Sequence, residues 1–230
     1  MFLNYYDHIY HVKLAVDYFK WDKFTLLAHS MGAHVGLFFA SMYPEKVERM
    51  ISLDVIQQLS AKASFLPMQL RSVMDDFQSI MTKIDRSPAY STYENIRQKY
   101  VESYNGSIST EDADILLVRG LAKKGSDEYY FTRDLRNVIR PYIFTDFTRE
   151  QMRAFSSSIS CPLMIIKART KHLLKSLKEY EDEILSLYRE NSPDFRFIEV
   201  QGTHHVHLGA AQLVAPFICD FLNPLLKAKL

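Results

Sequence analysis

The segment Phe24-Thr-Leu-Leu-Ala-His-Ser-Met-Gly-Ala33 constrains the fold of this chain more than any other stretch of its sequence. The short run over residues 25–27 is typical of a strand buried on both faces, and Gly32 opens a helical pattern. Ser30 then stands at a sharp strand-to-helix turn, which needs small residues two positions before and after it. Ala28 and Gly32 meet this need, so the segment predicts an exposed, nucleophilic serine.

The elements around this turn predict a parallel sheet. A helix with apolar residues at helical spacing precedes it, and a second strand over residues 47–54 follows the helix after Ser30. A helix between two short strands is a βαβ unit, which implies parallel strands and a right-handed crossover. Further strands are expected at 161–168 and 195–200, and a closing helix is expected to end at Asn223-Pro224.

The distribution of apolar residues, Gly and Pro along the sequence divides the chain into three parts. At 230 residues, with 47% hydrophobic residues, it can bury a substantial core. Between residues 55 and 160, short helical patterns are interrupted by Gly and Pro, which is typical of a helical insertion. We therefore predict a core segment at 1–54 that contains the Ser30 turn, a helical lid at 55–160, and a returning core segment at 161–230 with the last strands and a histidine-containing loop.

Composition argues against several classes of function. The net charge is +1, from 28 basic and 27 acidic residues, so a nucleic-acid partner is not expected. No apolar run approaches the roughly 20 residues of a membrane span. The first residues lack the basic and apolar regions of a secretory signal, which favours a cytoplasmic location. The two cysteines form no C-x-x-C pair, and the sequence predicts neither a metal site nor a cofactor.

A serine nucleophile needs a general base, because its free hydroxyl reacts poorly at neutral pH. The candidate bases are four histidines, one beside the serine and three just after the last expected strand: His29, His204, His205 and His207. Asp54 ends the second strand, where a carboxylate can orient an imidazole. It could instead be a helix cap or turn residue. The backbone N–H of Met31 is a candidate oxyanion donor.

Further segments carry a resemblance to a known family. With the Ser30 turn, the strand that ends in Asp54 and the lid, the chain resembles the α/β-hydrolase superfamily, and within it the serine hydrolase-like (kraken-like) proteins. The similarity extends from the first helix onward. It is carried by Ser91-Thr-Tyr-Glu94, Leu116-Leu-Val-Arg-Gly-Leu121, Tyr130-Phe-Thr-Arg-Asp134, Cys161-Pro-Leu-Met-Ile-Ile-Lys167 and His204-His-Val-His-Leu208.

The resemblance implies an α/β-hydrolase fold and a serine hydrolase acting through an acyl-enzyme on Ser30. Alignment with the family's Gly-His-aromatic-x-His-Leu pattern gives the role of base to His204, with His205 as the fallback and His29 as a residue that orients the turn. The implied substrate is a small ester, thioester or amide. The lid's aromatic and Met content suggests an acyl or aryl group, although core packing would explain the same composition.

The acid of this triad has several candidates. Many relatives place it after the strand that here ends at Ala168, where this chain offers no carboxylate. Asp54 corresponds to the position used by other branches of the superfamily, and its order after Ser30 and before His204 agrees with the usual chain order. Glu179 and Glu181 are the more distant alternatives and are expected to be surface charges.

The chain also departs from the family pattern. Family members carry four further strands before the first helix, and one leads into a His-Gly loop that supplies an oxyanion donor. Nothing in this sequence matches that loop, so the strand before Ser30 is expected to form an open edge. The alternative is therefore a catalytically impaired or non-catalytic hydrolase-like protein, in a truncated form, with a binding or regulatory role. A third alternative is a non-functional fragment that folds poorly.

The last three residues, Ala-Lys-Leu230, resemble the peroxisomal Ser-Lys-Leu signal. They predict an import receptor as a partner and a peroxisomal location. The alternative is a frayed basic tail on a protein of the cytoplasm.

Overall fold

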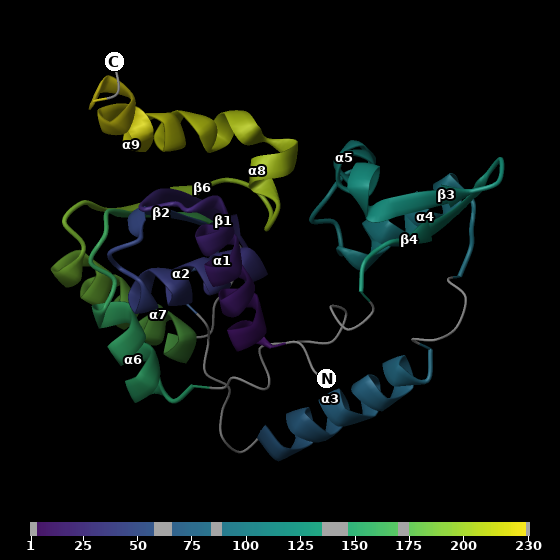
Figure 1. Cartoon of the computed structure of the whole chain (residues 1–230), viewed down its shortest axis with the longest axis horizontal. Helices are drawn as coiled ribbons and strands as arrows, with labels where there is room; N and C mark the ends of the chain where they lie inside the picture. Colours follow the sequence, from purple (N-terminus) through teal and green to yellow (C-terminus); the bar gives the residue numbers. More distant parts are fainter. Residues whose placement is uncertain (1–3, 58–65, 84–88, 135–146, 170–174, 229–230) are drawn as a thin grey trace. The chain divides into compact units, whose positions relative to one another are not determined.

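The computed structural model describes residues 4–57, 66–83, 89–134, 147–169 and 175–228 (Figure 1). The chain forms two compact units. The first, called here the sheet unit, consists of Asn4–Ala61 and Thr145–Leu230, and the second, the insertion unit, of Met1–Leu3 and Lys62–Phe144. Helix α6 (Arg149–Ser157), which lies within the insertion predicted at 55–160, belongs to the sheet unit.

The described part of the sheet unit contains a parallel sheet with the order β1-β2-β5-β6. Its strands are β1 (Phe24–His29), β2 (Val47–Leu53), β5 (Leu163–Ala168) and β6 (Phe195–Val200). Because parallel strands end at the same edge, the residues that follow them gather there. His29 pairs with Leu53, and Leu53 with Ile166, so the residues after β1 and β2 lie side by side.

Helices cover both faces of this sheet, as a parallel sheet requires (Figure 1). One face carries Met50, Leu163 and Ile165, which pack with buried residues of α1 (Tyr5–Phe19), α2 (Met31–Met42), α6 and α7 (Lys175–Asn191). The other face carries Ile51, Met164 and Ile166 beneath α8 (Val206–Gly209) and α9 (Ala215–Ala228). The alternation of side chains along each strand therefore creates two apolar layers around one sheet.

Two helices of the sheet unit end in different ways. Helix α1 ends at Phe19, and Lys20 caps it in the left-handed conformation that commonly closes a helix. The last helix continues through Pro224 to Ala228, so the predicted end at Asn223-Pro224 is wrong. A proline removes only one N–H donor and permits the helix to resume after a local distortion. Residues 229–230, which belong to the proposed import signal, lie outside the described residues.

The insertion unit contains helices and a small hairpin. Its helices are α3 (Leu66–Met81), α4 (Tyr93–Ser103) and α5 (Thr110–Gly120), and the hairpin pairs β3 (Leu121–Lys124) with β4 (Glu128–Phe131). The sequence analysis did not predict the hairpin. Buried Ile96 and Leu117 pack with Tyr129 and Phe131, which gives this part of the unit its own apolar cluster. Among the described residues of the whole chain, no helix has the length and apolarity needed to cross a membrane.

Candidate active site

Ser30 lies at the turn between β1 and α2, in the position that the sequence predicts. Its backbone has φ 51° and ψ −124°, a conformation that residues with a side chain rarely adopt. The turn brings strand and helix close together. A Cβ on Gly36 would lie 3.7 Å from the Cβ of Ala28 and 2.8 Å from Cε of Met50. Small residues therefore permit the crossing that holds Ser30 in this strained conformation.

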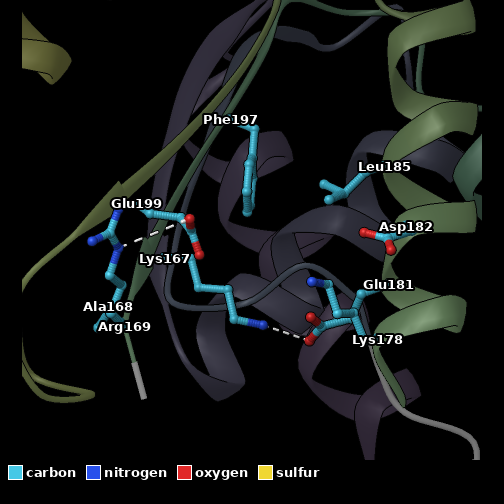
Figure 2. A pocket seen from close by; sticks show the side chains of 9 residues that line it. All are labelled: Lys167, Ala168, Arg169, Lys178, Glu181, Asp182, Leu185, Phe197 and Glu199. Carbon is cyan, nitrogen blue, oxygen red and sulfur yellow. Dashed lines mark hydrogen bonds and ion pairs between the residues drawn. The ribbon is translucent and has the colours of Figure 1, made fainter. Parts of the chain in front are cut away.

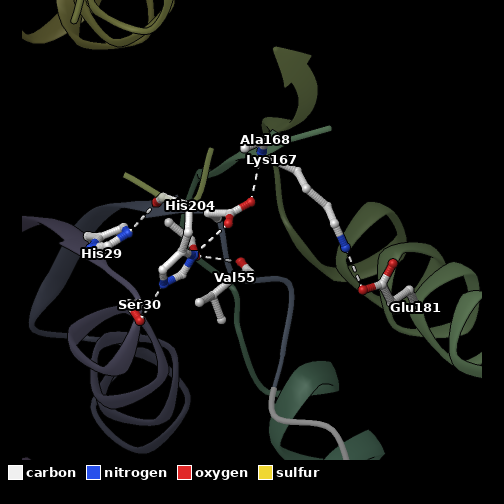
Figure 3. Close-up of polar contacts among 9 residues, drawn as sticks. His29, Ser30, Val55, Lys167, Ala168, Glu181 and His204 are labelled. Atoms are coloured by element: carbon white, nitrogen blue, oxygen red, sulfur yellow. Dashed lines mark hydrogen bonds and ion pairs between the residues drawn. The ribbon is translucent and has the colours of Figure 1, made fainter. Parts of the chain in front are cut away.

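The hydroxyl of Ser30 points away from the helix that it begins. A serine at a helix N-cap commonly accepts a hydrogen bond from the first turn, but Ser30 makes no such side-chain bond. Its Oγ instead lies 2.7 Å from Nε2 of His204 (Figure 3). His204 belongs to the loop between β6 and α8, which places the ring at the carboxyl edge of the sheet. The hydroxyl can donate its hydrogen to this ring nitrogen.

The other ring nitrogen of His204 faces Asp54. The distance from Nδ1 to Oδ2 of Asp54 is 2.6 Å. A carboxylate accepts hydrogen bonds only, so Nδ1 carries the hydrogen and leaves the Nε2 lone pair free for the serine. The side chain of Asp54 is 9% exposed and that of His204 is 37% exposed. The three residues therefore form one continuous hydrogen-bonded chain that runs from a buried carboxylate to a more accessible hydroxyl.

Several bonds that the sequence analysis missed hold Asp54 in this position. The backbone N–H of Ala168 donates to Oδ1 of Asp54 at 2.8 Å, and the N–H of Asp54 donates to the carbonyl of Ile166 at 2.7 Å. Inside the turn after β2, the buried hydroxyl of Ser52 donates to the carbonyl of Val55 at 2.5 Å. One carboxylate oxygen thus binds the neighbouring strand while the other binds His204. No pattern of residue types predicts a hydrogen bond from a backbone N–H.

The remaining candidate histidines surround His29. The Nε2–H of His29 donates to the backbone carbonyl of His204 at 2.7 Å, and its ring centroid lies 4.8 Å from that of His205 and 4.2 Å from that of His207. Burial, with smaller contributions from the neighbouring imidazoles, lowers the pKa of His29 to about 4. Although these rings are close, no group of three or more His, Cys, Asp or Glu among the described residues could hold a metal ion.

Met31 is the first residue of α2, so the helix offers no acceptor for its backbone N–H. This group follows Ser30 directly and lies at the positive end of the helix dipole. Such a donor can stabilise an oxygen atom that becomes negative when the serine attacks a carbonyl group. Met31 thus stands at the helix N-terminus, where the sequence predicts an oxyanion donor, and its role stays a prediction.

The two alternative acids lie on α7, and both ring nitrogens of His204 are already bonded to Ser30 and Asp54. Glu181 forms an ion pair with Lys167 at 2.5 Å, and Glu179 is exposed. Figure 2 shows the charged pocket that Glu181 and Lys167 help to line, in which Arg169 lies 3.9 Å from Glu199. Glu181 on α7 and Glu199 on β6 thus have basic neighbours of their own.

Comparisons with known proteins identify the family to which the chain belongs. A family described as "alpha/beta hydrolase fold" matches residues 3–211. A Drosophila melanogaster protein named "Probable serine hydrolase" is 30% identical over 221 residues, which cover 95% of this chain and 66% of the relative. A Danio rerio "Serine hydrolase-like protein" is 29% identical over 217 residues, which cover 93% and 64%. The chain spans just under two thirds of the length of these relatives.

Solved structures share the fold. A crystal structure of a hypothetical protein from Pseudomonas aeruginosa PAO1 is similar with a TM-score of 0.75 and 26% identity, covering 97% of this chain and 75% of that one. A thioesterase domain from the curacin biosynthetic pathway gives a TM-score of 0.67 at 18% identity, covering 94% and 73%. At this low identity, the second comparison concerns the fold alone.

Proposed function

Because this chain belongs to the α/β-hydrolase fold family, we propose that it is a serine hydrolase with Ser30 as nucleophile, His204 as general base and Asp54 as the residue that orients His204. The observation that carries the proposal is the continuous hydrogen-bonded chain of these side chains at the carboxyl ends of the strands. The names of the Drosophila and zebrafish relatives support the same reaction class.

The proposed reaction proceeds in two halves. Oγ of Ser30 attacks the carbonyl carbon of the substrate while Nε2 of His204 takes the hydroxyl proton, and Asp54 stabilises the imidazolium that results. The N–H of Met31 donates to the negative oxygen of the tetrahedral intermediate. When the intermediate collapses, His204 protonates the leaving group and an acyl group remains on Ser30. Water, deprotonated by His204, then releases the acid and restores the serine hydroxyl.

The proposed substrates are small esters, thioesters or amides, because a serine nucleophile suits acyl transfer. Among these we favour carboxylic esters with an apolar acyl or aryl group. This preference rests on the aromatic and Met residues of the insertion unit, although Tyr129 and Phe131 are among those that pack in that unit's own apolar cluster.

Covalent labelling with a fluorophosphonate tests the proposal. Intact mass spectrometry should show one adduct on the folded protein, peptide mapping should assign it to Ser30, and Ser30→Ala should remove it. His204→Ala should slow labelling strongly, whereas His205→Gln should label like the unmodified chain and so exclude the fallback base. If the folded chain, checked by circular dichroism, remains unlabelled, the catalytic proposal fails and the binding or regulatory alternative replaces it.

We also propose that the terminal Ala-Lys-Leu directs the protein to peroxisomes through an import receptor. The support is the sequence of the tail, whose last two residues lie outside the described part of the chain. A fluorescent protein fused ahead of residues 225–230 should coincide with a peroxisomal marker, and removal of Leu230 should disperse it. Diffuse fluorescence from the intact tail would favour the cytoplasm instead.

A further inference from the structure

We propose that His29 is a positioning residue that holds the main chain of His204, so that one imidazole can meet Ser30 and Asp54 at the same time. This inference rests on the proposed hydrolase function and adds a residue to its machinery. His29 contacts the backbone of the base and is argued to act only through it.

The bond between His29 and His204 links opposite edges of the described sheet. His29 ends β1 and His204 follows β6, and these are the two outer strands of the order β1-β2-β5-β6. The loop after β6 must therefore extend across the ends of β5 and β2 to bring its imidazole to Ser30. A hydrogen bond from the far edge is well placed to fix the end of this path.

Two backbone bonds beside His204 join residues close together in the sequence. The N–H of Val206 donates to the carbonyl of Thr203, and the N–H of Leu208 donates to the carbonyl of His205. Gly202 tightens the same loop, because a Cβ at that position would lie 2.5 Å from a methyl carbon of Val206. These contacts give the loop its shape but do not tie it to β1. The bond from His29 supplies that tie, at 2.7 Å.

A neutral imidazole suits this task better than a charged side chain. The acceptor is a carbonyl oxygen, so His29 must present an N–H, which the neutral ring provides at Nε2. Its centroid lies only 4.6 Å from that of His204. A cation at this distance would oppose the imidazolium that forms on His204 when Ser30 is deprotonated. Burial of His29 keeps its ring uncharged and so removes this conflict.

Loss of the bond should affect the chemical step more than substrate binding. Misplacement of a reacting group by 1 Å can cost about 10²-fold in rate. His29→Leu removes the donor, whereas His29→Gln retains an N–H on a side chain of similar reach. We expect kcat for a p-nitrophenyl ester to fall about 10- to 100-fold in His29→Leu with KM nearly unchanged, and to recover largely in His29→Gln. His11→Gln, an exposed histidine of α1, is the matched control.

Proton NMR supplies a readout that does not depend on turnover. The Nδ1–H of His204, bonded to Asp54, should give a low-field resonance in the unmodified chain and in His29→Gln. In folded His29→Leu this resonance should broaden or disappear. Retention of the resonance and of kcat in His29→Leu would overturn the proposal, and so would an equal loss in both His29 variants. If the unmodified chain neither turns over nor labels, the hydrolase proposal fails, while the NMR comparison still decides the role of His29.

Discussion

The ends of the neighbouring strands β2 and β5 differ in what they contribute to the site. After β2 comes Asp54, a nearly buried carboxylate that faces His204. The end of β5 contributes the N–H of Ala168, which binds Asp54, and Lys167, which pairs with Glu181. The end of β5 thus helps to hold Asp54 but contributes no carboxylate to the site itself. The comparison teaches that the position of a carboxylate at the sheet edge, and the bonds that orient it, matter more than the number of acidic residues nearby.

The largest expected effect is on Asp54. Asp54→Asn keeps the size of the side chain but removes the negative charge that fixes the tautomer of His204, so esterase turnover should fall by up to about 10⁴-fold. Steady-state kinetics with a p-nitrophenyl ester would measure the loss, and circular dichroism would check the fold. Turnover equal to that of the unmodified chain would show that Asp54 is not the acid and would leave the alternative acids on α7 as candidates.

The turn that carries Asp54 should be sensitive to Ser52→Ala. This change leaves the carbonyl of Val55 without its buried donor, so the free energy of unfolding should fall by about 1–3 kcal/mol. Urea denaturation would measure the change. Ser158→Ala is the matched control, because it removes a hydroxyl bond to the carbonyl of Ala154 at an exposed position, and it should have a much smaller effect. Equal losses would show that the turn after β2 has no special importance.

A buried histidine in the helix after Ser30 should make the free energy of unfolding depend on pH. His34 on α2 has a buried Nδ1 without a hydrogen bond, and burial lowers its pKa to about 4 from 6.5. Below pH 6.5 the unfolded chain binds a proton that the folded chain does not. The free energy of unfolding should therefore fall as pH drops from 6.5 towards 4, by up to about 1.4 kcal/mol per pH unit for one histidine.

Urea denaturation between pH 7.5 and pH 4 would test this sign. His34→Leu should make the decline shallower and leave the part that comes from His29, whose pKa burial also lowers to about 4, whereas His11→Leu, at an exposed position on α1, should leave the decline unchanged. A stability that rises as the pH falls through this window would contradict the assignment of His34 as a neutral, buried group.

The smallest effect is expected at the end of β5. Glu181→Gln removes the charged partner of Lys167, whose side chain is only 15% exposed, but the Gln side chain keeps the size of Glu and its oxygen can still accept a hydrogen bond from Nζ of Lys167. Turnover should remain within about threefold of that of the unmodified chain, since Glu181 acts outside the hydrogen-bonded chain. Glu179→Gln, at an exposed position on the same helix, provides the baseline. A loss of turnover confined to Glu181→Gln would give that residue a part in the site.

The sequence predicted the fold class and the family, and both predictions are confirmed. The informative signals were the small residues around Ser30, the apolar runs of the strands, and the positions of Asp54 and His204 just after strands. These patterns reflect local geometry, which can be predicted from the spacing of residue types along the sequence. The structure brings the three side chains together, and their catalytic roles remain predictions.

Other features could not be predicted from the sequence, and the reasons are physical. The bond from Ala168 comes from the backbone, which is chemically alike at almost every residue. The acceptor of His29 lies 175 positions away, and the bond depends on how far the loop after β6 extends across the ends of β5 and β2. The continuation of α9 through Pro224 was also missed, because a proline removes only one N–H donor and does not by itself forbid the helix from continuing.

The rate at which a fluorophosphonate labels Ser30 in Asp54→Asn and in Glu181→Gln tests the central claim most directly. Both variants remove one carboxylate charge from the neighbourhood of the ends of β2 and β5, and intact mass spectrometry follows both on the same scale. Labelling should slow by at least about 10²-fold in Asp54→Asn and stay close to that of the unmodified chain in Glu181→Gln. Rapid labelling of Asp54→Asn together with slow labelling of Glu181→Gln would contradict the assignment of the acid to the end of β2.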